Sequence, residues 1–152
     1  MILSETAKTG LLAAGWTPNR SIDISRYEEL LTQNEYVIND LVRAVLAEFG
    51  GLVLDIPSFG CDEIRDTAHF DVIKAESVSD NVEILKRYAD GLLVPLGQVY
   101  QNHITTFISL SGKVYGEYTD FWFLGDDIYD YINGLYQRRC GKTIYVPEMY
   151  VI

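Results

Sequence analysis

The sequence predicts a single α+β domain with an antiparallel-rich sheet and helices packed on it. Apolar residues recur every three to four positions up to about residue 90, and they alternate with polar residues beyond that point. No regular β-α-β alternation and no internal repeat interrupts this order. Helices followed by a run of strands are typical of the α+β class. A chain of 152 residues is long enough for one domain with a buried core.

The stretch with the largest predicted contribution to folding is residues 37–52, a buried helix followed by a strand at residues 52–56. Asn39 is its predicted N-cap, because its side-chain oxygen can accept from an unpaired backbone N–H. Gly50 and Gly51 are expected to end the helix in the left-handed conformation. The predicted buried stripe follows a 3.6-residue period and consists of Ile38, Leu41, Val42, Val45, Leu46 and Phe49.

Two shorter helices are predicted before it. Residues 4–14 form an amphipathic pattern, and Trp16, just beyond it, is expected to cover the helix core with its N–H bonded to a partner. A second helix of about two turns runs through Leu31. Ser25 is its predicted N-cap, because Glu28 three residues later completes a capping box.

The segments after the central helix are less regular. Residues 58–67 are predicted as a polar loop with a short edge strand, and residues 68–72 as a strand. Residues 78–89 show helical spacing. Residues 92–99 form a strand that we expect to be bent or at a sheet edge, because Pro95 has no backbone N–H to donate.

The last part of the chain is predicted as a strand meander with one helix. Ser111-Gly112 marks a hairpin turn between two of the strands. Asn133-Gly134 is the expected end of the helix. The predicted strands are residues 103–110, 113–118 and 121–124, the helix is 126–133, and an irregular strand follows at 143–146.

Composition limits the classes of partner. The formal net charge is −10 and the pI about 4.5, so nucleic acid is not expected as a direct partner, because phosphate binding needs a basic face. No apolar run approaches the roughly 18 residues of a membrane span, and the N-terminus has no signal-peptide pattern, so a cytoplasmic protein is expected. An acidic chain attracts basic partners, although acidity also serves solubility alone.

No sequence motif of the chain indicates a reaction, and no catalytic, cofactor or metal site is predicted. His69 and His103 lack a third ligand at suitable spacing, and no phosphate-binding glycine pattern occurs. Cys61 or Cys140 could pair with a histidine as a nucleophile, but the sequence offers no geometry for it. Asp126-Asp127 is more simply a pair of acids at a helix start. A small enzyme with a histidine or acidic pair in an undetected pocket stays open as an alternative.

Aromatic residues are concentrated in the second half of the chain, which has most of the eleven tyrosines. Phe121, Trp122 and Phe123 are consecutive, so they all face one core only if they do not form a strand. Tyrosine is enriched at protein interfaces. This concentration of aromatic residues is explained either by a thick core or by an interface with a partner or a second copy. The tyrosines concerned are Tyr100, Tyr115, Tyr118, Tyr129, Tyr131 and Tyr136.

Five short segments, in this order, make the chain resemble the SUKH superfamily, most closely its third group. They are LLAAGWTPNR at 11–20, FGGL at 49–52, VPLG at 94–97, SLSGKVY at 109–115 and LG at 124–125. The resemblance covers residues 6–134 and implies one domain over 1–152 with a mixed, bent sheet and flanking helices, leaving the tail at 135–152 unassigned. The recurring family residues match Trp16, Arg20, Gly50, Gly51, Leu52, Pro95, Gly97, Gly112 and Tyr115.

The resemblance also implies a function. Many bacterial members are non-catalytic immunity proteins of polymorphic toxin systems, which bind a nuclease or deaminase toxin domain inside the producing cell and block it. A nuclease active site is basic, so an acidic protein can imitate its substrate. The alternative is a general protein-interaction or regulatory module with no toxin partner. The expected contact residues are Asp62, Glu63, Asp66, Tyr118, Asp120 and Trp122.

Overall fold

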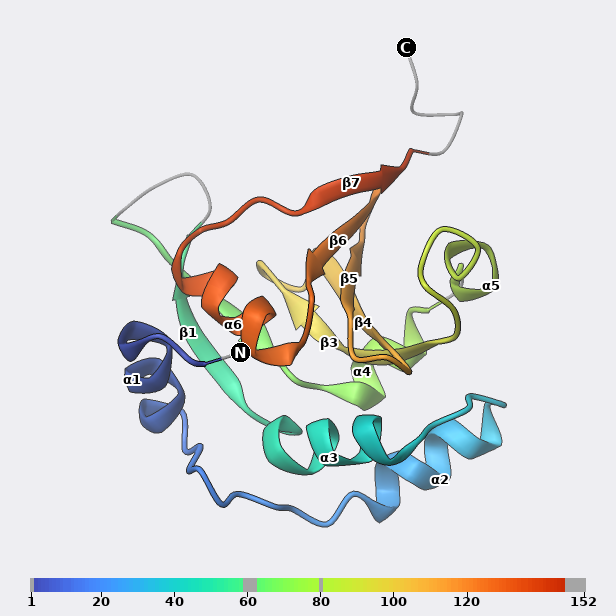
Figure 1. Ribbon diagram of the computed structural model, residues 1–152, viewed down its shortest axis with the longest axis horizontal. Coiled ribbons are helices and arrows are strands. Elements are labelled where there is room, and N and C mark those ends of the chain that lie inside the picture. Colours follow the sequence, from blue (N-terminus) through green and yellow to red (C-terminus); the bar gives the residue numbers. More distant parts are fainter. Residues whose placement is uncertain (1, 59–62, 80, 147–152) are drawn as a thin grey trace.

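The computed structural model describes residues 2–58, 63–79 and 81–146, which form an α+β arrangement (Figure 1). The helices are α1 Glu5–Ala13, α2 Ser25–Gln33, α3 Asp40–Phe49, α4 Val72–Ser77, α5 Val82–Leu85 and α6 Ile128–Tyr136. The strands are β1 Val53–Pro57, β2 Arg65–His69, β3 Leu93–Val99, β4 Ile104–Ser109, β5 Val114–Glu117, β6 Phe121–Gly125 and β7 Lys142–Tyr145. The predicted fold class is confirmed.

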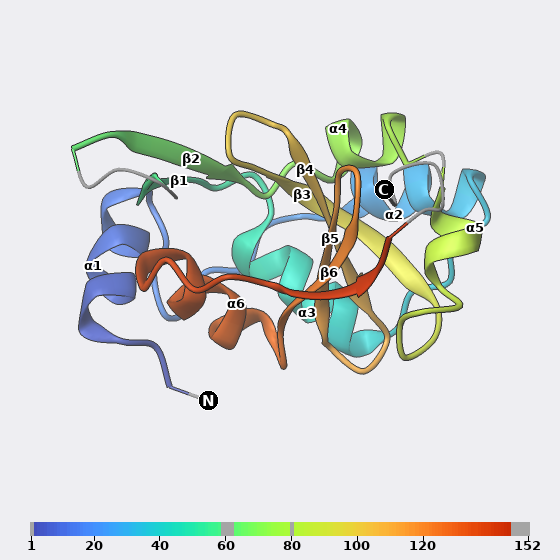
Figure 2. The same cartoon turned by 90° about the horizontal axis from the view of Figure 1, so that it is seen from above.

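The seven strands form one sheet in chain order, and each neighbouring pair in the described residues is antiparallel. The sheet is bent, because α6 contacts both β1 and β6, the first and sixth strands. In a flat sheet these strands would be about 24 Å apart, whereas a helix with its side chains is about 10–12 Å wide. Figures 1 and 2 show α6 inside this curve and β7 at the edge of the sheet beside β6.

The central helix α3 begins as predicted. The Asn39 side chain accepts from the Val42 N–H at 3.0 Å. The predicted buried stripe is wrong at Leu41, which is 42% exposed, because this side chain lies against the β4–β5 turn at Gly112 instead of the core. Of the two predicted left-handed glycines, only Gly51 has a positive φ, of 82°. The helix residues that are fully buried are Val42, Leu46 and Phe49.

Trp16 and Arg20 fasten the start of the chain to the end of α3. The Trp16 Nε1–H donates to Glu48 Oε2 at 3.0 Å, and the Tyr129 hydroxyl donates to Glu48 Oε1 at 3.0 Å. Arg20 donates to the carbonyl oxygens of Glu48 at 2.6 Å and Gly50 at 2.8 Å. A cation here satisfies carbonyls that lack a helical partner and complements the helix dipole. The predicted role of Trp16 is confirmed.

The predicted capping box of α2 is wrong. The Ser25 backbone N–H and hydroxyl both donate to Asp23 Oδ1, at 2.9 and 2.6 Å, so the serine oxygen caps nothing. The N-cap position is Ile24, whose side chain makes no capping bond. The Asp23 carboxylate is a stronger acceptor than the Ser25 hydroxyl, so both donors of Ser25 bond to it.

The region after β1 also differs from its prediction. The strand predicted at residues 68–72 begins earlier and is β2. The single helix predicted at residues 78–89 is replaced by two helices, α4 and the short α5. Asp71 starts α4 early, because its side chain accepts from the Lys74 N–H at 3.0 Å. A local cap therefore overrides the helical spacing that begins at Val78.

β3 is bent, as its proline indicates, but it is the third strand of the sheet rather than an edge. Pro95 is tolerated because β2 pairs only with the far end of β3, through Gln98 and Val99, and α4 contacts β3 instead. The register shifts between Pro95 and Gly97. A Cβ at Gly97 would lie 1.8 Å from the His69 carbonyl oxygen, so this close strand contact requires glycine.

The last helix runs past its predicted end. Asn133-Gly134 is buried within α6, which continues to Tyr136. The Asn133 side chain accepts from the Ser4 N–H at 2.8 Å and donates to the Ile2 carbonyl at 2.9 Å. These bonds hold the N-terminal segment, so the asparagine serves a long-range contact instead of a turn.

Both faces of the sheet carry apolar clusters. The larger cluster includes α1, α3 and α6 residues, and the smaller one consists of Leu85, Leu93, Phe107, Tyr115 and Phe121 with partly buried neighbours. Phe121 is fully buried, whereas Trp122 on the opposite face of β6 is half-buried. The aromatic crowding therefore supplies a thick core and also leaves exposed rings, because Tyr118 is 57% exposed.

Candidate functional site

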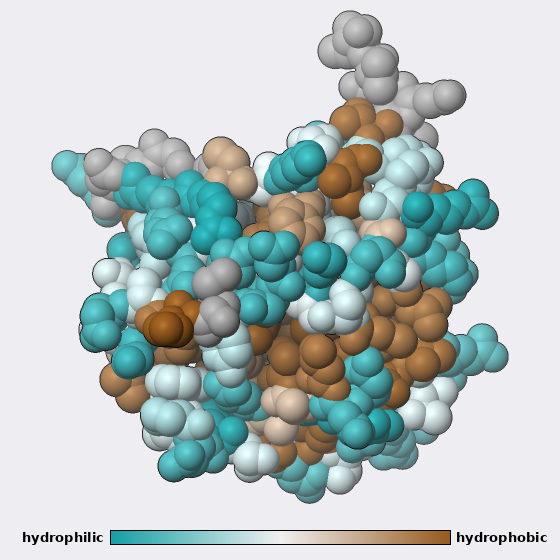
Figure 3. Space-filling view, viewed as in Figure 1, coloured by the Kyte–Doolittle hydropathy of each residue, from teal (hydrophilic) through white to brown (hydrophobic). Residues whose placement is uncertain are grey.

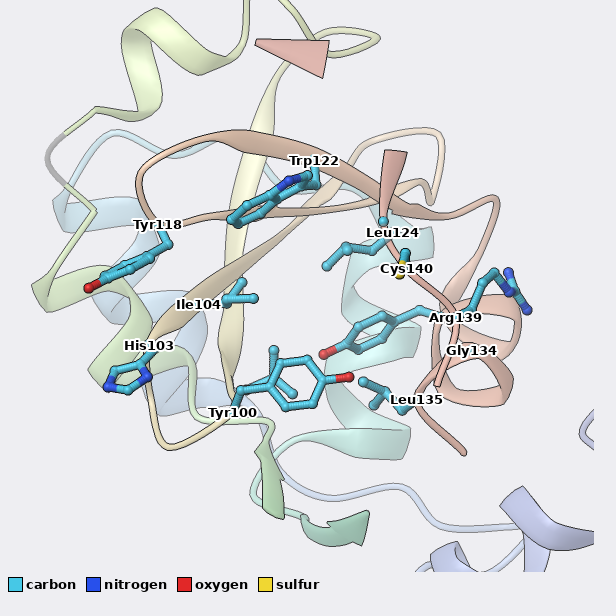
Figure 4. A pocket seen from close by; sticks show the side chains of 13 residues that line it. Tyr100, His103, Ile104, Tyr118, Trp122, Leu124, Gly134, Leu135, Arg139 and Cys140 are labelled. Carbon is cyan, nitrogen blue, oxygen red and sulfur yellow. The ribbon is translucent and has the colours of Figure 1, made fainter. Parts of the chain in front are cut away.

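A pocket of about 440 Å³ lies inside the curve of the sheet, between the β3–β6 strands and α6 (Figure 4). Its volume falls in the range of small-molecule and side-chain sites. The walls are mainly aromatic and aliphatic, and they include Tyr100, His103, Tyr118, Trp122, Leu124 and Tyr131.

The pairing of β5 with β6 directs two of these side chains into the pocket. Trp122 and Leu124 alternate with Phe121 and Phe123, which belong to the cluster on the opposite face. Gly116 lies opposite Trp122 in the register. A Cβ at Gly116 would be 2.8 Å from Leu124, so the glycine leaves the space that these side chains occupy.

The β3–β4 turn forms a second wall in an unusual conformation. Tyr100, Gln101 and Asn102 all have positive φ, of 57°, 57° and 63°. This conformation costs about 1–2 kcal/mol for each non-glycine residue. Tertiary bonds hold it: the Tyr100 N–H donates to the Thr67 carbonyl at 3.1 Å, and the Gln101 N–H donates to Asp66 Oδ1 at 2.9 Å.

The rim of the pocket is an aromatic stack. The rings of His103 and Tyr118 lie 5.8 Å apart at 27°, and both residues are exposed. The Tyr118 N–H donates to the Asp120 carbonyl at 3.1 Å, which forms the β5–β6 turn. Among the described residues, neither the Tyr118 hydroxyl nor the Trp122 indole N–H has a hydrogen-bond partner.

The far end of the pocket contains an ion pair. Arg139 donates to Asp130 Oδ1 at 2.7 Å, and the Asp126 N–H donates to Asp130 Oδ2 at 2.8 Å. Burial opposes ionisation of Asp130, but these two donors outweigh it and lower the pKa of the carboxyl. Figure 4 shows Arg139 at the opposite end from Tyr118, with its guanidinium directed away.

Two of the tyrosines that line the pocket, Tyr100 and Tyr131, have hydroxyls that stay protonated at neutral pH. Burial, helped by the Asp66 carboxylate and Cys140, raises the pKa of Tyr100 to about 12. Burial also raises the pKa of Tyr131. The interior of the pocket therefore offers neutral hydroxyl groups, which can both donate and accept.

The predicted contact residues fall into different places. Tyr118 and Trp122 line the pocket, and Asp120 lies in the turn between them. Asp66 is half-buried beneath the β3–β4 turn, where its carboxylate also accepts from the Thr67 N–H at 2.8 Å. Glu63 is exposed in the loop before β2, and Asp62 lies outside the described residues.

Sequence reasoning did not assign Tyr100, His103 or Arg139 to this site. Tyr100 belongs to the aromatic crowding, and His103 was considered only as a metal ligand or as part of a catalytic site. No local signal shows that Arg139 lies near them, since it follows α6 and reaches the pocket only through the bend of the sheet. Sequence reasoning alone also gives no sign of the left-handed turn at Tyr100.

A second surface is the apolar patch beside the β4–β5 turn, which Figure 3 shows below the middle of this face. Val37 is 55% exposed, Leu41 42% and Leu92 41%. The Asn39 side chain donates to the Leu110 carbonyl at 2.8 Å, so α3 and the turn are joined here.

The two histidines are the residues that the sequence offers for catalysis or metal binding. His69 bonds the Thr67 hydroxyl at 3.1 Å, and His103 is not hydrogen-bonded to a nucleophile or carboxylate within the described part of the chain. No group of three histidines, cysteines or acids close enough for a metal ion occurs in that same part. None of its helices has the length and apolarity needed to cross a membrane.

Comparison with known families gives one match. A family model described as "SUKH-3 immunity protein" matches residues 3–138, slightly more than the 6–134 expected from the sequence motifs. No curated protein and no solved structure matches the chain. The resemblance stated from the sequence is confirmed, and residues 139–152 lie beyond the matched span.

Proposed function

Because the chain belongs to the SUKH-3 immunity protein family, we propose that it binds a cognate toxin domain and blocks it without catalysis. The family match over residues 3–138 carries this proposal. Such a protein acts in the cytoplasm of the cell that makes the toxin. The toxin is a secreted nuclease or deaminase of a polymorphic toxin system.

The charge of the chain supports a basic partner. The formal net charge is −10. A nuclease or nucleic-acid deaminase binds a polyanion, so the surface around its active site is positively charged. An acidic protein associates rapidly with such a surface and excludes the substrate from it.

The pocket supports a contact surface on the concave side of the sheet. Tyrosine and tryptophan dominate the energetic centres of protein interfaces, and Tyr118 and Trp122 present exposed ring surface there. Asp62, Glu63, Asp66 and Asp120 are proposed to surround this centre with negative charge. Among the residues that recur in the family, Trp16 and Arg20 make internal bonds, so they are assigned to folding rather than to the partner.

The test is co-expression with the toxin domain encoded next to this gene. Survival of cells that otherwise die, together with co-purification of the two proteins, would support direct neutralisation. The matched control is an unrelated toxin domain expressed at the same level, which should remain lethal. Undiminished killing by the cognate toxin, with folded protein present in the lysate, would contradict the proposal and favour an interaction module without a toxin partner.

A further inference from the structure

The aromatic end of the pocket offers ring faces rather than a closed apolar hole. Trp122 is half-buried and Tyr118 is 57% exposed, and His103 stacks on Tyr118 to complete the rim. In Figure 4 the Tyr118 and Trp122 rings lie near each other at one end of the pocket. A cation within about 6 Å of such ring faces is attracted by their electron density.

Two carboxylates lie near this end of the pocket. Asp120 lies in the same turn as Tyr118 and makes no ion pair with another described residue. Asp66 lies beneath the β3–β4 turn, held there by the Gln101 N–H. The one arginine that lines the pocket, Arg139, is neutralised by Asp130 at the far end.

The rim also carries two polar atoms that are not hydrogen-bonded within the described part of the chain. The Trp122 indole N–H and the Tyr118 hydroxyl have no hydrogen-bond partner among the described residues. Tyr100 and Tyr131 line the wall, and the Tyr131 hydroxyl bonds the Thr106 side chain. The Tyr118 hydroxyl oxygen can accept a hydrogen bond from a guanidinium, whereas an apolar side chain offers it no donor.

We propose that this pocket is a socket for the guanidinium of an arginine side chain presented by the toxin, stacked on Trp122 and Tyr118. Arginine fits better than lysine, because its planar group stacks on aromatic rings and directs five donors at surrounding oxygens. The partner surface is expected to be basic because this chain has a net charge of −10, and this inference rests on the proposed function.

The first experiment uses the protein alone and small probes. A two-dimensional ¹H–¹⁵N spectrum contains one indole signal from each of the two tryptophans. The protein is titrated with N-acetylarginine amide and, as the matched control, with N-acetylcitrulline amide, which has the same shape without the charge. Trp16 is an internal reference, because its N–H is bonded to Glu48 and its side chain is buried.

The Trp122 signal should shift at least about threefold more with the arginine probe than with the citrulline probe, and the Trp16 signal should not move. The Trp122→Leu variant, whose fold is checked by the unchanged Trp16 signal, should lose the difference at neighbouring pocket residues. Equal shifts with both probes, or no shift, would overturn the arginine socket.

The second experiment measures toxin affinity. Trp122→Leu keeps an apolar side chain but removes the ring, and it should weaken binding about tenfold or more, whereas Trp122→Phe should change binding less than about threefold. Binding that tolerates Leu as well as Phe would overturn the inference and leave the proposed function standing. A wild-type protein that responds to the arginine probe but binds no toxin would overturn the proposed function and support the socket for another partner.

Discussion

The two tryptophans of this protein lie in opposite environments, although both lie beside turns. Trp16 is 5% exposed, and its N–H donates to the Glu48 carboxylate. That carboxylate also accepts from the Tyr129 hydroxyl, and Arg20 bonds the Glu48 carbonyl at the end of α3. Trp122 is half-buried, and its N–H has no partner among the described residues. The first belongs to the family motif and stabilises the fold, whereas the second presents part of its ring to solvent. A recurring aromatic residue therefore does not by itself mark a binding site.

The largest expected effect separates the two residues directly. Trp16→Ala should lower the free energy of unfolding by about 3–5 kcal/mol, because it leaves a cavity and removes the donor to Glu48. Trp122→Ala should lower it by no more than about 1 kcal/mol, because its ring is already partly hydrated. Urea unfolding followed by circular dichroism measures both. Similar losses in the two variants would contradict the distinction.

A smaller effect is expected at Arg20, which makes two charged hydrogen bonds at the end of α3. Arg20→Lys retains the charge but reaches only one carbonyl, so it should cost about 1.5–3 kcal/mol. The same unfolding experiment measures it. Toxin affinity of the folded variant should equal that of the wild type, and a selective loss of affinity would place Arg20 in the interface.

Substitutions of Asp66 test whether this residue stabilises the β3–β4 turn through its hydrogen bonds or through its negative charge. Asp66→Ala should cost about 1–2 kcal/mol, because the Gln101 and Thr67 N–H groups lose their acceptor. Asp66→Asn keeps an acceptor oxygen and should cost less. Thermal unfolding measures both.

The exposed Glu63 is the matched control for charge. Glu63→Lys should leave stability within about 0.5 kcal/mol and slow toxin association in a salt-dependent way. Stopped-flow association at two salt concentrations checks it. Equal association rates for Glu63→Lys and the wild type would remove this loop from the binding surface.

The last expected effect appears only at high pH. Burial, together with its bond to Glu48, raises the pKa of Tyr129 to about 12, and the pKa of Tyr100 is raised to the same value mainly by burial. Below the ordinary tyrosine pKa of 10.0 both states keep the proton, so stability is fully present. Between about 10 and 12 the unfolded chain loses protons first, so stability falls as pH rises.

The Tyr129→Phe variant checks that assignment. Its stability should fall less steeply than that of the wild type between pH 10 and 12, because one linked group has been removed. Urea midpoints at several pH values in that window measure the slope. An unchanged slope would mean that Tyr129 ionises at its ordinary pKa in the folded protein.

Local signals predicted much of the secondary structure. The Asn39 cap, the Ser111-Gly112 hairpin and the bend at Pro95 follow from residues within a few positions of one another. Two of the errors occurred where another residue offered a better bond than the local motif. Asp23 took the donors of Ser25, and Asn133 bonded the N-terminal segment instead of forming a turn.

The pocket could be predicted only in part. Trp122 was expected to be exposed because consecutive aromatic residues in a strand exclude a single buried face, and Tyr118 because tyrosine is enriched at protein interfaces. Their position opposite Tyr100 and Arg139 depends on the curvature of the sheet, and nothing local encodes it. The role of Asp66 beneath the turn was missed for the same reason, because the bond to Gln101 joins residues 35 positions apart.

The sequence by itself determined the α+β class, the membership of the SUKH-3 family, the acidity of the chain and most element types, because these depend on composition, periodicity and short motifs. Only the tertiary structure decided which aromatic side chains are buried and which line a pocket. It also decided that the β3–β4 turn adopts three consecutive left-handed residues. The physical reason is that bonds between distant residues offset local conformational costs, and the bend of the sheet creates a concave surface that no single segment contains.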